Sequence, residues 1–140
     1  MKLTIKQALE KAADFERNGD YSSAILYCEA ILKGEPLNLE ANFLLGKQYL
    51  LLKNFLLALK PLELTTEINP NEAKYWQCYL NALNELNRQA RYESVLEKAI
   101  VAGHKSHELK QNLREKKAVS KIARSNRDTQ KGVKHTGNGR

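Results

Sequence analysis

Residues of like character recur 34 positions apart along most of this chain. Pro36 and Pro70 are separated by this interval, and so are Tyr21 and Phe55. Further matches at the same offset are apolar or small in each copy: Ala24 with Ala58, Cys28 with Leu62 and Leu96, and Phe15 with Tyr49 and Leu83. The residues between them differ freely, which is typical of a structural repeat. Such an interval favours stacked copies of one small unit.

Each unit is predicted to hold two helices joined by a tight turn. Thr4, with Gln7 three residues later, forms a capping-box pattern that opens the first helix. Gly19 suits the left-handed conformation that follows a helix end, so we expect the helix to stop there. Residues 21–33 place their apolar side chains on one helical face. Further helices are expected at about 39–52, 55–68, 72–86 and 90–102. Pro61 lies inside the fourth helix and predicts a kink or a locally opened turn, because proline removes one backbone hydrogen bond.

The leucine-rich stretch 40–60 is not expected to cross a membrane. Lys53-Asn54 and Lys60-Pro61 divide it into short segments, whereas a spanning helix needs about 20 mostly apolar residues. The chain is 42% hydrophobic and 28% charged, an ordinary composition for a soluble protein, and it lacks the alternating pattern of strands. An all-α fold follows. The N-terminus shows no secretory signal, and Cys28 and Cys78 are interpreted as buried free thiols, so we expect a cytoplasmic protein.

The excess of positive over negative charge is confined to one end of the chain. The formal net charge is +7, and residues 116–140 contain eight Lys or Arg residues and one acidic residue, Asp128. Residues 1–115 are therefore formally neutral. Such a segment can bind phosphates with weak, salt-dependent affinity, although it lacks the aromatic side chains on which bases stack. A solvated extension, RNA, an anionic membrane surface and an acidic protein all stay open as explanations of this charge.

The three units resemble the tetratricopeptide repeat (TPR) family. That pattern places aromatic, leucine and small residues on helix A, small and apolar residues on helix B, and a proline after helix B. The first unit matches at Ala12, Phe15, Gly19, Tyr21, Ala24 and Pro36. The second matches at Leu45, Gly46, Tyr49, Phe55, Ala58, Leu62 and Pro70. The third matches at Trp76, Tyr79, Leu83, Leu96 and Ala99. It departs at Leu80, where a small residue is usual, and at His104, where proline is usual.

The resemblance implies a solenoid of three hairpins, with repeats at about 5–38, 39–72 and 73–104. Residues 105–122 are expected to form a terminal helix that caps the stack, with Ser106 at its start and Leu109 and Leu113 as its apolar stripe. The TPR domain would then span 1–122, followed by a disordered basic tail at 123–140. Residues 1–9 and 69–103 are also similar to the N-terminal repeat module of bacterial TPR proteins that carry glycosyltransferase or sulfotransferase domains.

The family lines its concave surface with helix A of each repeat, and this implies a groove here. We expect a peptide or helix of a partner protein to bind there. The predicted groove residues are Leu9, Phe43, Lys47, Leu50, Leu51, Lys74, Gln77, Asn81 and Asn84. Phe43 and Leu50 would supply apolar contact, and the amides of Asn81 and Asn84 could bond a peptide backbone. The alternative is that Phe43 and Leu50 only pack against neighbouring repeats.

Two ligand patterns known in TPR proteins do not fit this sequence. The carboxylate clamp uses lysines, asparagines and an arginine. The matching positions here are Leu9, Ala13, Leu44, Lys74 and Cys78, so only Lys74 fits. The asparagine ladder of the repeat-bearing glycosyltransferases is also missing, because Leu44 and Cys78 stand at its positions.

The sequence contains no pattern that indicates catalysis. His104 and His107 are three residues apart, but a metal site needs three or four ligands, and Glu108 is their only neighbouring carboxylate. No serine or cysteine has an identifiable base. We therefore expect no enzyme activity, no metal and no cofactor. The predicted function is a non-catalytic protein-interaction module, with self-association also open. The alternatives are an accessory module of a glycosyl- or sulfotransferase system, and nucleic-acid binding through the basic segment.

Overall fold

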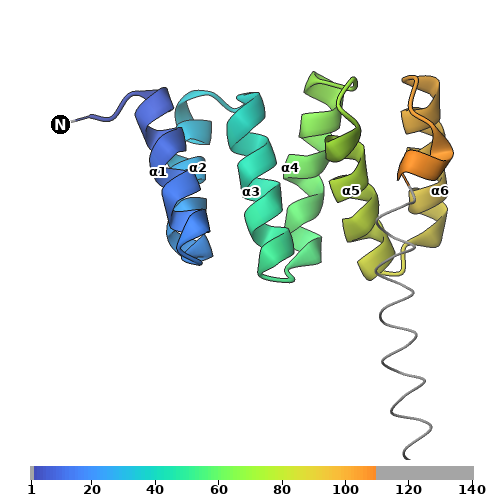
Figure 1. The fold of residues 1–140 in the computed structure, drawn as a ribbon, viewed down its shortest axis with the longest axis horizontal. Coiled ribbons are helices and arrows are strands. Elements are labelled where there is room, and N and C mark those ends of the chain that lie inside the picture. The colour runs from blue at the N-terminus through green and yellow to red at the C-terminus, as the bar shows by residue number, and fades with distance from the viewer. Residues whose placement is uncertain (1, 110–140) are drawn as a thin grey trace, which may run out of the picture.

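The computed structural model describes residues 2–109, and within that range it contains helices and no strands. In order, the helices are α1 (Ile5–Arg17), α2 (Tyr21–Gly34), α3 (Leu39–Leu51), α4 (Phe55–Ile68), α5 (Ala73–Glu85) and α6 (Gln89–Val101). They form three antiparallel hairpins that stand in a row, with the N-terminus at one end (Figure 1). The all-α prediction is confirmed, and the helix bounds differ from the expected ones by one residue at most.

The predicted capping box at the start of α1 is present. Gln7 N donates to Thr4 Oγ1 at 3.1 Å, and Thr4 N donates to Gln7 Oε1 at 2.9 Å. The predicted local opening at Pro61 is not observed, because α4 continues through this residue as one helix. Pro61 is buried, and its carbonyl accepts a hydrogen bond from Thr65 Oγ1 at 2.7 Å. Because α4 packs between α3 and α5, the helix continues across the missing backbone hydrogen bond.

The turn inside each hairpin has the same backbone geometry. Gly19, Lys53 and Asn87 lie 34 residues apart and have positive φ angles of +77°, +59° and +57°. The residue after each of them donates its N–H to a carbonyl five residues back. These bonds are Asp20 N to Phe15 O (2.8 Å), Asn54 N to Tyr49 O (2.8 Å) and Arg88 N to Leu83 O (3.0 Å). This six-to-one bond is the Schellman motif, and it turns the chain back on itself within three residues.

The links between hairpins repeat as well. The Pro36 carbonyl accepts from Asn42 Nδ2 at 3.0 Å, and the Pro70 carbonyl accepts from Trp76 Nε1 at 2.8 Å. His104, which stands at the next proline position, brings its Nε2 to 2.8 Å from the Pro70 carbonyl. The departure from the family pattern at His104 thus has a structural role, since its ring ties the end of the third repeat to the turn of the second.

The start of the predicted terminal helix closes the described part of the stack. Residues 106–109 are helical, and Leu109 N donates to Lys105 O, so the helix is capped one residue before Ser106. Leu109 is fully buried against the core that includes Leu80 and Leu83. Leu113, the remainder of 105–122 and the basic tail at 123–140 lie outside the described residues.

Two expectations about the chain as a whole can be compared with residues 2–109. None of the helices found there is long and apolar enough to cross a membrane. Neither Cys28 nor Cys78 forms a disulfide bond, but only Cys28 is buried as predicted, while Cys78 is half-buried. Burial, together with the nearby carboxylates of Glu16 and Glu29, raises the pKa of the Cys28 thiol to about 12.

Candidate peptide-binding cleft

A cleft of about 680 Å³ opens between α1 and α3, and Tyr75 of α5 contributes to one end of it. Its lining follows the period of the two helices. Ile5, Leu9 and Ala13 are spaced four apart on α1, and Leu39 and Phe43 are spaced four apart on α3. Residues at this spacing share one helical face, so each helix turns a mostly apolar stripe toward the other.

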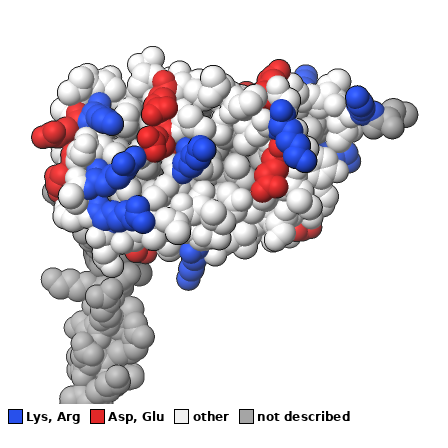
Figure 2. Space-filling model, turned by 180° about the vertical axis from the view of Figure 1, so that it is seen from behind, with Lys and Arg blue, Asp and Glu red and all other residues white. Residues whose placement is uncertain are grey.

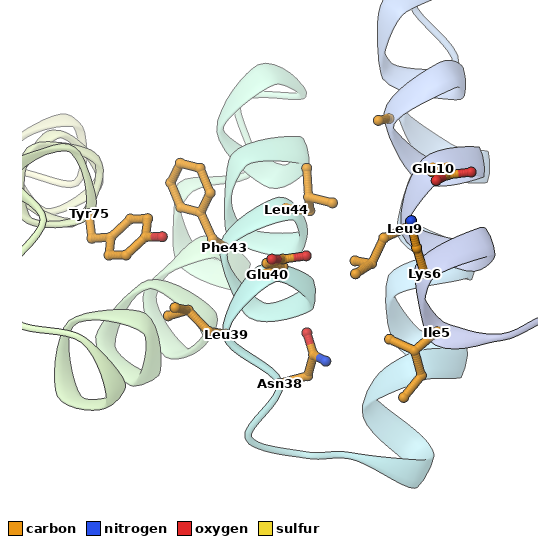
Figure 3. Close-up of a pocket in the computed structure, with 11 residues that line it drawn as sticks. Ile5, Lys6, Leu9, Glu10, Asn38, Leu39, Glu40, Phe43, Leu44 and Tyr75 are labelled. Atoms are coloured by element: carbon orange, nitrogen blue, oxygen red, sulfur yellow. The ribbon is translucent and has the colours of Figure 1, made fainter.

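The close-up shows how these side chains meet (Figure 3). Leu9 on α1 and Leu44 on α3 point into the space between the two helices, with Ile5 below them. The rim is polar, and its members are Lys6, Glu10, Asn38 and Glu40. An apolar floor with a polar rim of both charge signs can enclose a hydrophobic side chain while leaving the backbone of a ligand in contact with polar groups.

Phe43 stands at the junction of the second and third repeats. Its ring centroid lies 4.8 Å from that of Tyr75, with the planes tilted by 51°. Lys74 Nζ lies 5.3 Å from the centre of the Phe43 ring, within the range of a cation–π contact. Burial, followed by the carboxylates of Glu72 and Glu40, raises the pKa of Tyr75, so its hydroxyl stays neutral and can donate a hydrogen bond at the mouth of the cleft.

Lys47, one of the predicted groove residues, is paired within the chain. Its Nζ lies 2.8 Å from Glu16 Oε1, and this bond joins α1 to α3 beyond the apolar part of the cleft. The Glu16 side chain is 17% exposed and that of Lys47 is 43% exposed. The pair therefore limits the cleft on this side, and a ligand would compete with Glu16 for the lysine.

The predicted residues of the third repeat lie apart from this cleft. Gln77 Nε2 donates to the Glu108 carbonyl at 3.1 Å, so the start of the terminal helix already occupies that amide. Asn81 Oδ1 is buried without a hydrogen-bond partner among the described residues. Asn84 is half-buried, and Lys74 reaches only the Phe43 ring.

Of the nine predicted groove residues, the structure brings Leu9 and Phe43 together in the cleft. Leu50 is half-buried against the core, and Leu51 is exposed near the turn between α3 and α4. Sequence reasoning missed Ile5 and Leu39, although each stands four residues before a predicted member. It also missed Tyr75, which reaches the cleft only because α5 packs beside α3, and no pattern within one helix contains that information.

The described residues do not bring metal ligands together. Residues 2–109 contain no group of three or more His, Cys, Asp or Glu side chains placed to hold a metal ion. His104 is engaged with the Pro70 carbonyl, and its ring lies 6.4 Å from that of Trp76. The cleft between α1 and α3 is the candidate site because it combines apolar anchors with a polar rim.

No family model and no curated protein sequence matches this chain. Solved structures do match. The first TPR of Spaghetti (RPAP3) bound to the HSP90 peptide SRMEEVD has a TM-score of 0.67 and 20% identity, over 83% of this chain and 93% of that one. The CopN–Scc3 complex gives a TM-score of 0.69 and 18% identity, over 79% and 67%. These likenesses, together with the three hairpins, show that the chain has the TPR fold.

The chain is also similar to part of an enzyme structure. A mutant O-GlcNAc transferase of Thermobaculum terrenum has a TM-score of 0.64 and 27% identity over 81% of this chain. The chain spans 22% of that transferase.

Proposed function

We infer that this protein is a non-catalytic interaction module that binds an apolar segment of a partner protein, as a helix or an extended peptide, in the cleft between α1 and α3. The observation that carries this proposal is the apolar cleft itself. Leu9 and Leu44 face each other across it, and Phe43 with Tyr75 closes one end. A few large apolar anchors in a preformed cleft supply most of the affinity in such interfaces.

The chemistry of the lining favours an apolar ligand over a terminal carboxylate. Three of the five positions that would form a carboxylate clamp, Leu9, Ala13 and Leu44, line the cleft with hydrocarbon. Lys74 lies over the Phe43 ring. The solved TPR structures with bound HSP90 peptide or with Scc3 support a partner protein as the ligand class, but the lining indicates a different anchor from a clamped carboxylate.

The charge distribution also favours recognition by shape and apolar contact. The cleft rim carries Lys6 and Glu10 on α1 and Glu40 on α3, so charges of both signs are present. On the opposite side of the molecule, charged side chains of both signs are intermixed among uncharged ones (Figure 2). Neither surface presents the single-sign field that steers a nucleic acid. Nucleic-acid binding through 116–140 stays a prediction of the sequence, since that segment lies outside the described residues.

Site-specific photocrosslinking in the source cells tests the proposal. A photoreactive phenylalanine analogue would replace Leu9 or Phe43 in the cleft, and as a matched control would replace Glu93, which is exposed on α6. We expect a discrete protein adduct from the two cleft positions and none from the control position. Adducts of equal strength from all three positions, or from Glu93 alone, would contradict the assignment.

The second candidate is an accessory module of a glycosyltransferase system, and the similarity to the O-GlcNAc transferase favours it. In that case the cleft would hold a segment of the catalytic protein or of its substrate. The same crosslinks distinguish the two candidates, because mass spectrometry of the adduct would identify a transferase or a transferase substrate.

A further inference from the structure

A second apolar surface lies at the turn between α3 and α4, outside the cleft. Leu51, Leu52, Leu56 and Leu57 are 44%, 45%, 57% and 52% exposed, and all four fall within seven consecutive residues. We name them the leucine cluster. Single exposed leucines are ordinary, but four around one turn form a patch that calls for a partner.

The other two repeats show that the TPR fold does not need leucine at these positions. Thirty-four residues earlier, the same places hold Arg17, Asn18, Ser22 and Ser23. Thirty-four residues later, they hold Glu85, Leu86, Ala90 and Arg91. Seven of these eight residues are polar or small. Because the helices and turns are otherwise alike, the leucine cluster belongs to the second repeat and not to the architecture.

Two lysines accompany the cluster. Lys53 is exposed at the turn with a φ of +59°, where the corresponding residues are Gly19 and Asn87. Both are better suited to a left-handed backbone than lysine is. Lys60 is exposed on α4, three residues after Leu57 and therefore on the same face. Neither lysine forms an ion pair with a residue of the described range. The cluster is thus apolar with a free positive border.

The neighbouring turns limit how wide the occupant can be. The α1–α2, α3–α4 and α5–α6 turns lie along one edge of the molecule (Figure 1). On either side of the leucine cluster this edge is charged, with Arg17 and Asp20 at the first turn and Glu85 and Arg88 at the third. A planar lipid surface would meet all three turns at once. A discrete element of a partner protein can meet the middle turn alone, which favours the protein.

The leucine cluster is too small to hold two copies of this chain together as a stable dimer. Together the four side chains expose about as much surface as two fully exposed leucines. Each partner in a stable dimer of standard size buries roughly 800 Å². The cluster is far smaller than that, but it suits the apolar face of a short helix.

We propose that the leucine cluster, with Lys53 and Lys60, docks a short amphipathic helix of a partner protein whose apolar face is bordered by acidic residues. The leucines cover the apolar face, and the two lysines pair with the flanking carboxylates and set the preference for acidic helices. This surface is separate from the cleft, so the protein can hold two segments at once. The proposal does not depend on the function assigned to the cleft.

A pair of synthetic peptides tests this with the full chain. The probe is a helical peptide of about 15 residues with leucines on one face and glutamates along its border. The matched control carries lysines in place of the glutamates. Affinity is measured by fluorescence anisotropy, and the contact surface is mapped by amide shifts in NMR spectra. We expect the glutamate peptide to bind at least about tenfold more tightly than the lysine peptide and to shift amides between residues 51 and 60.

Two double variants and one control variant complete the test. Leu56→Ser with Leu57→Ser, copying Ser22 and Ser23, should weaken the glutamate peptide at least about tenfold. Leu26→Ser removes a leucine that is 65% exposed on α2, outside the cluster, and should leave the affinity unchanged. Lys53→Asn with Lys60→Gln should remove the preference between the two peptides. If the serine variant loses its helical circular dichroism, the lysine variant decides the matter alone, because both of its changes are on exposed side chains.

The competing occupants have their own signatures. Equal affinity of the wild type for both peptides would overturn the proposal, and so would amide shifts confined to the cleft. Sedimentation with vesicles containing phosphatidylserine that is lost in the serine variant would identify a membrane site instead. A concentration-dependent dimer that is lost in the same variant would identify a second copy of this chain.

Discussion

Gly46 of α3 lies directly against Leu62 of α4, and the contact leaves no room for a larger residue. A Cβ atom at Gly46 would lie 2.6 Å from Leu62 Cδ2 and 2.7 Å from Leu62 Cγ. Leu62 is fully buried, so its side chain cannot swing away. In the third repeat the corresponding pair is Leu80 and Leu96, both large, and α5 and α6 pack less extensively than α3 and α4. The size of this one residue thus sets how closely each hairpin closes.

Gly46→Ala should therefore destabilise the protein. Overpacking of a buried contact costs about 1–3 kcal/mol, which exceeds the gain of about 1 kcal/mol that alanine brings to a helix interior. Urea unfolding followed by circular dichroism measures the change. The matched control is Gly34→Ala, since nothing lies within 4 Å of the added methyl there. A Gly46→Ala variant as stable as the wild type would refute the tight packing of this hairpin.

Gln48→Met should stabilise the protein. Gln48 is fully buried, and neither its Nε2 nor its Oε1 has a hydrogen-bond partner among the described residues. An unpaired buried polar group costs about 1–3 kcal/mol, and methionine keeps a similar shape without that penalty. The corresponding residue of the third repeat is Ala82, also fully buried. Thermal unfolding should show a higher Tm for this variant. In the control Gln89→Met only an exposed hydrogen bond to Glu93 is lost, so the Tm should not rise.

Lys53→Gly should also raise the free energy of unfolding. The φ of +59° at Lys53 is unfavourable for a side chain with a Cβ atom, and glycine relieves roughly 1 kcal/mol of this strain. Lys53→Ala keeps the Cβ atom and should bring no gain. A glycine variant no more stable than the alanine variant would show that the turn is not strained. The same glycine variant should weaken the glutamate peptide at the leucine cluster, so stability and docking would change in opposite directions.

Cys28 makes the stability of the fold depend on pH in the alkaline range. Its pKa is about 12 in the folded protein, against an ordinary value of 9.0. The unfolded chain therefore releases the thiol proton first, so stability falls as the pH rises from about 9 toward 12. Tyr49 and Tyr79, whose pKa values are also raised, chiefly by burial, act in the same direction.

The contribution of Cys28 is isolated with Cys28→Ala. Between pH 9 and pH 11, urea unfolding of this variant should show a shallower loss of stability than the wild type.

In a Cys78→Ser background, the remaining thiol should resist Ellman's reagent at pH 8 until urea unfolds the protein, because the thiolate is the reactive form. Rapid labelling of the native protein would contradict the burial of Cys28.

The sequence predicts much of this fold because the same pattern of apolar, small and turn residues occurs in three copies. Gly19 and the capping box at Thr4 indicate where hairpins turn and helices begin, and both are found as expected. Local patterns failed where packing decides the outcome. Pro61 has no N–H to donate, so one backbone hydrogen bond of α4 is missing, yet the neighbouring helices keep α4 continuous. Lys53 adopts the left-handed turn that propensity would assign to glycine, because the hairpin needs that conformation whichever residue stands there.

The candidate site was predicted less completely for a similar reason. Helix period places Leu9 and Phe43 on inward faces, and both line the cleft. It does not reveal that Lys47 pairs with Glu16, or that Gln77 bonds the Glu108 carbonyl. These contacts join residues from different helices, and the sequence of either helix alone does not contain them.

The central claim is that the cleft between α1 and α3 holds an apolar segment of a partner protein. Its most direct test is calorimetric titration of the segment captured by photocrosslinking into the wild type and into Leu9→Ala/Phe43→Ala. A hot-spot anchor contributes about 2 kcal/mol or more, which is roughly 30-fold in affinity, so the loss of both anchors should weaken binding by well over roughly 30-fold. Circular dichroism checks that the helical fold is intact. Unchanged affinity in the folded double variant would show that the partner binds elsewhere.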